Sequence, residues 1–324
     1  MIRLQNVSKK YAAAVAVNDV SLEVSEGETL VLLGTSGCGK TTTLKLINRL
    51  EELTAGSITV AGVAIQQQKP EELRRQIGYV IQGAGLFPHY TVQENIAVVP
   101  RLLKWGKPET ATRTHEVLEL LGMAPAQFLA KYPHELSGGQ QQRIGLARAL
   151  VTDPPVMLMD EPFGALDPIT RAHIRKEFKH LERRLQKTTV LVTHDIQEAF
   201  ELGDRICLMD AGKIQQLGTP QELVFRPANA FVSRFLQDQL FQLQLQVLRL
   251  HQLRPFLSPE ASPYPAAALT LPDSESVLEA TQQLASANLP QQSLQLEATD
   301  RAPAQWATLA ELMGAVAHFI PTLR

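Results

Sequence analysis

The sequence contains few cysteines and almost no excess charge. Its 324 residues include only two cysteines, Cys38 and Cys207, which excludes a disulfide framework and a cysteine-rich zinc site. The 31 Lys and Arg residues nearly balance the 33 Asp and Glu residues, so the net charge of −2 gives no general reason to expect DNA or RNA binding. We therefore expect free thiols in a reducing compartment and no nucleic-acid partner.

Long hydrophobic runs are absent as well. No stretch approaches the roughly 18 uninterrupted apolar residues that are typical of a membrane-spanning helix. The segment from Met1 to Asn6 lacks the charged and then apolar pattern of a signal peptide. We expect a soluble chain with one large and one smaller domain. Such a chain would work at a membrane only by docking on proteins that span it.

One glycine-rich segment carries the strongest chemical signal. Residues 34–41 match the G-x-x-x-x-G-K-[ST] pattern of a phosphate-binding P-loop. The flanking residues predict a buried strand over 29–33 and a helix over 42–47, so the loop lies at a helix N-terminus, whose dipole favours anions. Lys40 would reach the β- and γ-phosphates of a nucleotide, and the Thr41 hydroxyl would bind Mg²⁺. The alternative is a glycine-rich turn in another kind of α/β protein.

The order of the predicted elements indicates an α/β protein with a mostly parallel sheet and crossover connections. Residues 92–150 are predicted to be mainly helical. The predicted strands are 2–7, 14–20, 21–24, 29–33, 57–60, 63–65, 77–81, 156–159, 189–193, 206–209 and 213–217, with a long charged helix over 169–186.

The composition changes near residue 240. Residues 235–250 are rich in Leu and Gln, and four prolines follow between positions 255 and 265. We therefore predict a nucleotide-binding domain over 1–236, a linker over 237–265 and a small α+β tail over 266–324. Within the tail the pattern predicts a strand over 267–271, a helix over 276–288, a strand over 293–297 and a helix over 308–319.

The predicted strand over 156–159 ends in two carboxylates, Asp160 and Glu161. Asp160 could hold Mg²⁺ through water, which would complete the site that Thr41 begins. Glu161 lies one residue farther out, where it could act as a general base on the attacking water. A surface turn would explain such a pair equally well by itself, but downstream of a P-loop the pair indicates nucleotide hydrolysis.

The pentapeptide Leu-Ser-Gly-Gly-Gln at residues 136–140 stands immediately before a predicted helix. Its hydroxyl and free N–H groups would form a second anion cradle at a positive helix end, although a capped helix start would use the same residues. Together with the P-loop and the Asp-Glu strand, this pentapeptide makes residues 2–236 similar to the ABC-transporter ATPase family.

The resemblance implies a P-loop NTPase fold of the ABC ATPase type. Such a domain has a RecA-like core, an N-terminal antiparallel β subdomain and a helical subdomain, here at about 92–150. It also implies that two subunits pair head to tail, most simply as a homodimer. ATP would then lie between the P-loop of one subunit and residues 137–140 of the other.

The resemblance also assigns roles to single residues. Glu161, His194 and Gln82 would be catalytic, with His194 on the γ-phosphate and Gln82 sensing Mg²⁺ and the attacking water. Tyr11 would stack on adenine, with strand packing as its alternative, and a lone histidine such as His194 is more often structural. The implied Mg²⁺ ligands are Thr41, Gln82 and Asp160. The implied ATP-binding residues are Tyr11, Gly34, Thr35, Ser36, Gly37, Cys38, Gly39, Lys40, Thr41, Thr42, Ser137, Gly138, Gly139, Gln140 and Asp167.

Residues 47–50, 79–89 and 91–105 are similar to ATPases of importers for quaternary amines such as glycine betaine, carnitine, choline and proline betaine. That likeness implies permease partners at the cytoplasmic face of the cell membrane and, indirectly, an extracytoplasmic solute-binding protein. The segment 82–85 departs from the family in lacking bulkier residues. The alternatives are an importer of amino acids or other small solutes, a soluble ABC ATPase outside transport, and a non-catalytic nucleotide-binding regulator.

The tail has room for one unit of the CBS type. Relatives in the quaternary-amine group often carry two such domains as a sensor of ionic strength or nucleotides. The predicted order of strand, helix, strand and helix fits a single degenerate unit. A dimerisation or packing appendage is the alternative.

Overall fold

The computed structural model describes residues 1–323 except 13, 84, 258–268, 288–292 and 298–304. The chain forms two compact units, Met1–Leu217 and Gly218–Arg324. The boundary between them precedes residue 236, where the sequence predicts the end of the first domain. Helices occupy much of the segment that the sequence suggests is a linker.

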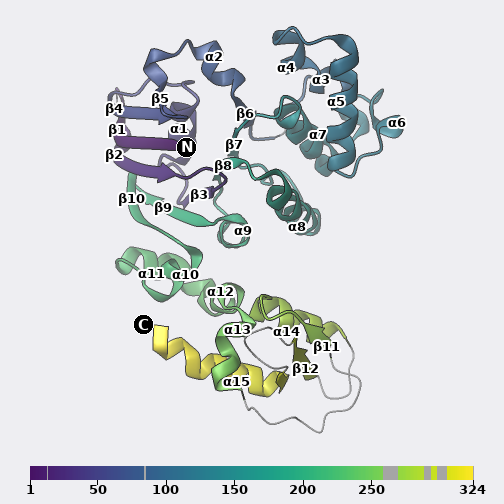
Figure 1. The fold of residues 1–324 in the computed structure, drawn as a ribbon. Coiled ribbons are helices and arrows are strands. Elements are labelled where there is room, and N and C mark those ends of the chain that lie inside the picture. Colours follow the sequence, from purple (N-terminus) through teal and green to yellow (C-terminus); the bar gives the residue numbers. More distant parts are fainter. Residues whose placement is uncertain (13, 84, 258–268, 288–292, 298–304, 324) are drawn as a thin grey trace. The chain divides into compact units, whose positions relative to one another are not determined.

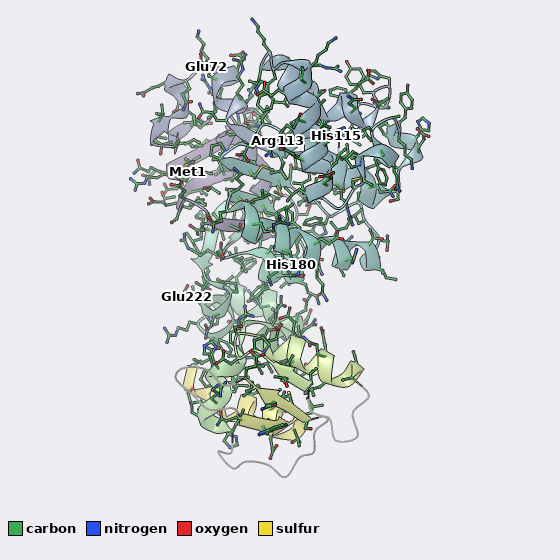
Figure 2. All side chains as sticks on the ribbon, turned by 45° about the vertical axis from the view of Figure 1, so that its right-hand side comes forward. Met1, Glu72, Arg113, His115, His180 and Glu222 are labelled. Carbon is green, nitrogen blue, oxygen red and sulfur yellow. The ribbon has the colours of Figure 1, made fainter. Side chains whose placement is uncertain are left out.

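The first unit begins with a four-stranded antiparallel sheet in the order β2-β1-β4-β5 (Figure 1). The N-terminal amine of Met1, labelled in Figure 2, donates to the carbonyl of Val24 at 2.8 Å and so joins the start of β1 to the end of β2. The strands are β1 (Ile2–Tyr11), β2 (Ala14–Val24), β4 (Ala55–Val60) and β5 (Val63–Ala64). The predicted break between residues 20 and 21 is wrong, since β2 is one strand. Its irregular pairing with β1 and the left-handed Asp19 (φ +56°) mark a bulge rather than a turn.

A six-stranded sheet in the order β10-β9-β3-β8-β7-β6 forms the centre of the first unit. The five strands from β9 to β6 are parallel, which confirms the predicted parallel sheet. Strands β3, β7 and β8 are buried along their whole length, as expected for parallel strands that are covered on both faces. The strands are β3 (Thr29–Gly34), β6 (Ile77–Val80), β7 (Val156–Asp160), β8 (Thr188–Val192), β9 (Arg205–Asp210) and β10 (Lys213–Gly218).

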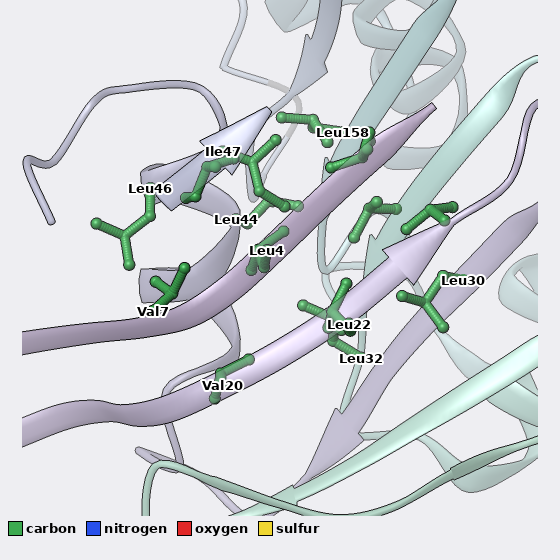
Figure 3. Close-up of a cluster of buried hydrophobic side chains, with 14 of the residues drawn as sticks. Leu4, Val7, Val20, Leu22, Leu30, Leu32, Leu44, Leu46, Ile47 and Leu158 are labelled. Carbon is green, nitrogen blue, oxygen red and sulfur yellow. The ribbon is translucent and has the colours of Figure 1, made fainter. Parts of the chain in front are cut away.

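Helix α1 (Lys40–Ile47) packs between the two sheets. Its residues Leu44, Leu46 and Ile47 are almost completely buried in one apolar cluster with residues of both sheets, including Leu4 and Leu32 (Figure 3). Each such side chain contributes about 1.5–3 kcal/mol through burial. This packing anchors α1, which directly follows the P-loop, against both sheets.

The helices between β6 and β7 gather on one side of the first unit (Figure 1), which confirms the predicted helical region. They are α3 (Val92–Ile96), α4 (Val98–Leu102), α5 (Lys107–Leu120), α6 (Pro125–Phe128) and α7 (Gly138–Leu150). Three further helices cover the sheets, namely α2 (Pro70–Arg75), α8 (Pro168–Leu185) and α9 (Ile196–Leu202). Short 3₁₀ turns lie at Ile65–Gln67 and Pro133–Glu135.

The second unit contains helices and a three-stranded sheet in the order β11-β12-β13. Strand β12 pairs in parallel with β11 and antiparallel with β13, and the pattern over 298–308 had not predicted β13. The elements are α10 (Pro220–Phe225), α11 (Ala230–Leu236), α12 (Leu240–Val247), α13 (Leu250–Leu253), β11 (Leu269–Leu271), α14 (Val277–Ser286), β12 (Ser293–Leu296), β13 (Gln305–Thr308) and α15 (Leu309–Phe319). Short 3₁₀ turns lie at Gln237–Gln239, Arg254–Phe256 and Ile320–Leu323. None of the helices in the described parts of either unit has the length and hydrophobicity needed to cross a bilayer.

Candidate functional site

The P-loop connects β3 to α1 as the sequence predicts, and Lys40 is its central side chain. Lys40 is 6% exposed, and its Nζ donates to the carbonyls of Gly34 and Thr35, each at 2.8 Å. Among the described residues no carboxylate forms an ion pair with this ammonium group. A third contact runs to Sγ of Cys38 at 3.7 Å, so the partners described for this buried cation are all uncharged, which favours an anionic ligand.

The surroundings of Gly34, Gly37 and Gly39 in the loop differ. A Cβ on Gly34 would lie 2.1 Å from the carbonyl oxygen of Met209, and one on Gly39 would lie 2.3 Å from that of Ala16. Gly37 has a positive φ of +75° but open space around it. Two of the three glycines are therefore required by close approach of the protein's own backbone, whereas an added Cβ on Gly37 would meet no atom within 4 Å.

Thr41 and Asp160 meet at the ends of neighbouring elements. The Thr41 hydroxyl on α1 donates to Oδ1 of Asp160 at the end of β7, at 2.9 Å. Burial raises the pKa of Asp160 above its usual range, while the hydrogen bond from Thr41 opposes that shift. Within the described chain, no three His, Cys, Asp or Glu side chains gather as a metal site. This hydroxyl and carboxylate are hard oxygen ligands of the kind that Mg²⁺ takes together with phosphate oxygens and water.

Glu161 lies between Gln82 and His194. Its Oε1 is 3.1 Å from Nδ1 of His194, and its Oε2 accepts from Nε2 of Gln82 at 3.3 Å. Its backbone is in the left-handed region, with φ +45°, which costs a non-glycine residue about 1–2 kcal/mol. Such strain at a polar residue in a cleft is a typical feature of functional sites.

The sheet order explains why these side chains meet. Strands β3, β8, β7 and β6 are parallel neighbours, so the P-loop, His194, Glu161 and Gln82 all follow carboxyl ends at one edge of the sheet. That edge is where α/β sheets bind ligands. A pocket of about 530 Å³ opens there, lined by Ser36, Gly37, Cys38, Gly39, Lys40, Thr41, Thr42, Gln82, Glu161 and His194.

Several predicted ATP contacts do not line this pocket. Tyr11 is 45% exposed at the end of β1, with Lys9 Nζ 4.9 Å from its ring centroid. Asp167 accepts from the backbone N–H of Thr170 at 3.1 Å and caps α8. Neither residue contributes to the walls of the pocket within this chain.

The Leu-Ser-Gly-Gly-Gln segment has structural roles within this chain. Ser137 caps α7 by accepting from the N–H of Gln140 at 3.3 Å, and the Gln140 side chain accepts from the N–H of Ser137 at 3.0 Å. A Cβ on Gly139 would lie 2.9 Å from Ile174 on α8, so this glycine allows the two helices to pack closely. Gly138 is exposed and unobstructed. The segment does not line the pocket of its own chain.

Asn95 was not singled out in the sequence, yet it organises the loop that follows Gln82. This side chain is fully buried. It accepts from the N–H of Phe87 at 2.8 Å and donates to the carbonyls of Phe87, Tyr90 and Thr91 at 3.0–3.1 Å. Arg148 near the end of α7 donates to the carbonyl of Gly85 at 2.8 Å. Four bonds to one amide depend on loop geometry, and the sequence pattern carries no signal for them.

Comparison with known proteins identifies a family likeness. Residues 17–164 match the profile described as ABC transporter. The chain is similar to the glycine betaine/carnitine/choline transport ATP-binding protein OpuCA of Bacillus subtilis, with 53% identity over 255 residues, which are 78% of this chain and 67% of that protein. It is also similar to the choline transport ATP-binding protein OpuBA of the same organism, with 54% identity over 244 residues, 75% of this chain and 64% of that protein. The match thus spans about two thirds of the length of these relatives.

A solved structure shows the same fold. The chain resembles the ATP-binding cassette MJ0796 in a dimeric post-hydrolysis state bound to ADP and Pi, with a TM-score of 0.61 and 34% identity. The likeness covers 68% of this chain and 98% of that one.

Proposed function

This chain belongs to the ATP-binding subunits of ABC transporters, and from that premise we propose that it hydrolyses ATP to drive uptake of a quaternary amine through a separate permease. The observation that carries the proposal is the pocket in which Lys40, Gln82, Glu161 and His194 converge. The pocket combines an anion site, formed by Lys40 and backbone N–H groups, with the Glu161 carboxylate, which Gln82 and His194 hold in place. Phosphoryl transfer needs both.

In this pocket we assign Glu161 as the general base. Its carboxylate would take a proton from water as the water oxygen attacks the γ-phosphorus and the bond to ADP breaks. Gln82 and His194 each contact one carboxylate oxygen and so limit its rotation. Because His194 uses Nδ1 for that contact, Nε2 is the ring nitrogen left for the γ-phosphate. Lys40 and the loop N–H groups would hold the β- and γ-phosphates.

The Mg²⁺ ion would be held by Thr41, Gln82 and Asp160. When bound, it neutralises charge on the phosphates. The contact between Thr41 Oγ1 and Asp160 Oδ1 supports this assignment, since two hard oxygen ligands already lie 2.9 Å apart.

We further propose that the active form is a head-to-tail homodimer. Ser137, Gly138, Gly139 and Gln140 lie outside the pocket of their own chain but carry an exposed helix N-terminus. In the dimer this segment would close the pocket of the second subunit. Asp167 would act across the same interface, and Tyr11 would stack on adenine.

The proposed solute is a quaternary amine such as glycine betaine, choline or carnitine. The similarity to OpuCA and OpuBA, ATP-binding proteins of glycine betaine, carnitine and choline transport, supports this choice. The chain would bind permease subunits at the cytoplasmic face of the cell membrane, and an extracytoplasmic protein would deliver the solute. We propose residues 1–236 as the ATPase domain. The tail would be a single CBS-like unit or a dimerisation or packing appendage.

Glu161→Gln tests the catalytic assignment. The amide keeps the shape and the contact with Gln82 but cannot take a proton, so we expect steady-state ATP hydrolysis to fall at least about 100-fold. ATP affinity, measured with a fluorescent analogue, should stay within about twofold, because Lys40 and the loop are unchanged.

Glu94→Gln is a suitable control, since Glu94 caps α3 away from the pocket. Its turnover should remain near that of the wild type. If Glu161→Gln hydrolyses ATP at the wild-type rate, Glu161 is not the base and the proposal fails.

A further inference from the structure

Arg171, on the first turns of α8, binds three carbonyl groups of the loop that follows Glu161. Its Nε donates to the carbonyl of Phe163 at 3.2 Å, and its Nη2 donates to those of Gly164 at 3.3 Å and Leu166 at 2.8 Å. A planar guanidinium can satisfy several acceptors in a fixed arrangement, which a lysine cannot do. One side chain therefore sets the shape of the loop over 163–166.

The same guanidinium also reaches the segment that carries His194. Nη1 of Arg171 is 3.7 Å from Oδ2 of Asp195, the residue directly after His194. Asp195 also pairs with Arg175 at 3.4 Å and caps α9 by accepting from the N–H of Glu198 at 3.2 Å. The ion pair with Arg171 is about three-quarters buried on both sides, so solvent screens it only in part.

Glu161 is held from both of these segments. Its carbonyl accepts from the N–H of Gly164 at 3.1 Å, and its own N–H donates to the carbonyl of Val192 at 2.9 Å. Its left-handed backbone persists only where neighbouring contacts determine it. The conformation of Glu161 is thus stabilised from two sides. One side is the loop over 163–166, and the other is the segment that precedes His194.

We propose that Arg171 is a positioning residue for hydrolysis, which joins the loop over 163–166 to Asp195 and thereby keeps Glu161 aligned with His194. This inference rests on the proposed function of Glu161. Within the described part of the chain, Arg171 does not line the pocket, and its polar contacts are with residues 163–166 and Asp195, none of which lines the pocket either. Its effect is therefore on turnover and not on nucleotide binding.

The test measures kcat, KM and ATP affinity for Arg171→Ala and Arg171→Lys. We expect kcat to fall roughly 10- to 100-fold in Arg171→Ala, because a misplacement of about 1 Å can have that effect. ATP affinity should change less than about twofold. The kcat of Arg171→Lys should lie between that of Arg171→Ala and that of the wild type. Asp195→Asn keeps the α9 cap but removes the ion pair, and it should also lower kcat.

Arg113 on α5, labelled in Figure 2, provides a matched control. It is similarly exposed, contacts the carboxylates of Glu116 and Asp153, and donates to the carbonyl of Val151 at 3.2 Å, all away from the pocket. Arg113→Ala should lose comparable stability in thermal melting without the loss of kcat. Equal losses of kcat in both variants would overturn the inference.

A double variant separates positioning from general damage. In the Glu161→Gln background there is no base left to align, so Arg171→Ala should lower the residual rate less than about twofold. Multiplicative losses, or a loss of ATP affinity in Arg171→Ala, would contradict the proposal. If Glu161→Gln itself is fully active, the proposed function fails instead, so the two failures are distinguishable.

Discussion

Some polar side chains in the first unit are buried, which costs desolvation free energy, and Glu198 is an example. It lies on α9 and is 2% exposed, and its Oε1 has no hydrogen-bond partner in the part of the chain that the structure describes. Burial and the charge of Asp195 raise the pKa of Glu198 to about 8. The folded protein therefore holds a proton that the unfolded chain releases near pH 4.5.

The sign of the resulting pH dependence follows from linkage. Between the two pKa values the folded state binds more protons than the unfolded state, so stability falls as pH rises. From about pH 5 to about pH 7.5 the Glu198 contribution should amount to a loss on the order of 3 kcal/mol. In Glu198→Gln this side chain is neutral at every pH. The variant should therefore lose that part of the dependence of the free energy of unfolding on pH, measured by urea unfolding at both pH values.

The exposed Glu72 on α2 supplies the control for that experiment. Glu72→Gln should show the same difference in the free energy of unfolding between the two pH values as the wild type. An identical pH slope for Glu198→Gln and the wild type would show that Glu198 is ionised in the folded protein.

The P-loop glycines make a second prediction at the scale of single residues. Gly39→Ala should lose most of its ATP affinity and several degrees of melting temperature, because the new Cβ would meet the Ala16 carbonyl at 2.3 Å. Gly37→Ala has open space and carries only the cost of its positive φ, about 1–2 kcal/mol. Equal melting temperatures for the two variants would contradict this view of the loop.

At the scale of elements, most helices and strands follow from local pattern and capping residues. The helix starts at Thr91, Ser137 and Thr308 each combine a hydroxyl cap with Glu or Gln three residues later. The pattern does not predict the strand over 305–308, and the segment 237–257, predicted as part of a linker with a helix over 235–250 as the alternative, forms short helices. These are short segments whose apolar positions become regular only after they pack against neighbours, as Leu243, Leu250 and Leu253 do.

The cap of α7 allows its structural and functional roles to be separated. Ser137→Ala should cost about 1 kcal/mol of stability through loss of the cap. If Ser137 also binds phosphate, ATP hydrolysis should fall roughly 10-fold or more. Thr308→Ala removes a matching cap from α15 and should cost similar stability with normal turnover. Equal turnover in the two variants would limit Ser137 to its capping role.

The whole-molecule prediction concerns a site shared between two chains. Lys40→Ala disables the P-loop, and Gly138→Asp places a carboxylate where the partner's phosphate is expected. Gly138 has only ordinary contact, 3.7 Å to Leu166, and Asp is favourable at a helix start, so Gly138→Asp should fold. Each variant alone should be inactive.

Mixing the two variants tests the head-to-tail arrangement. A mixed dimer contains one intact site, formed by the P-loop of the Gly138→Asp chain and the Ser-Gly-Gly segment of the Lys40→Ala chain. Random pairing should restore up to roughly a quarter of the wild-type rate after subunit exchange. A mixture that stays inactive, although mixed dimers are detected by differential tagging, would exclude the shared site.

Much of the local structure was determined by the sequence alone. The P-loop, the Asp-Glu strand end and the helix caps depend on residues that are adjacent in the chain, so their pattern predicts both conformation and chemistry. The α/β class, the parallel sheet and the family follow from the order of those segments.

Only the tertiary structure decided which of these segments meet. The strands follow the chain order β3, β6, β7, β8, but they lie side by side as β3-β8-β7-β6. That arrangement brings Gln82 and His194 to opposite sides of Glu161 and allows Arg171 to reach Asp195. Strand order is set by how crossover helices and buried faces pack over the whole unit. No local spacing in the sequence records that energy. The motifs and the family resemblance therefore predicted which residues form the site, and only the fold showed how they are arranged around Glu161.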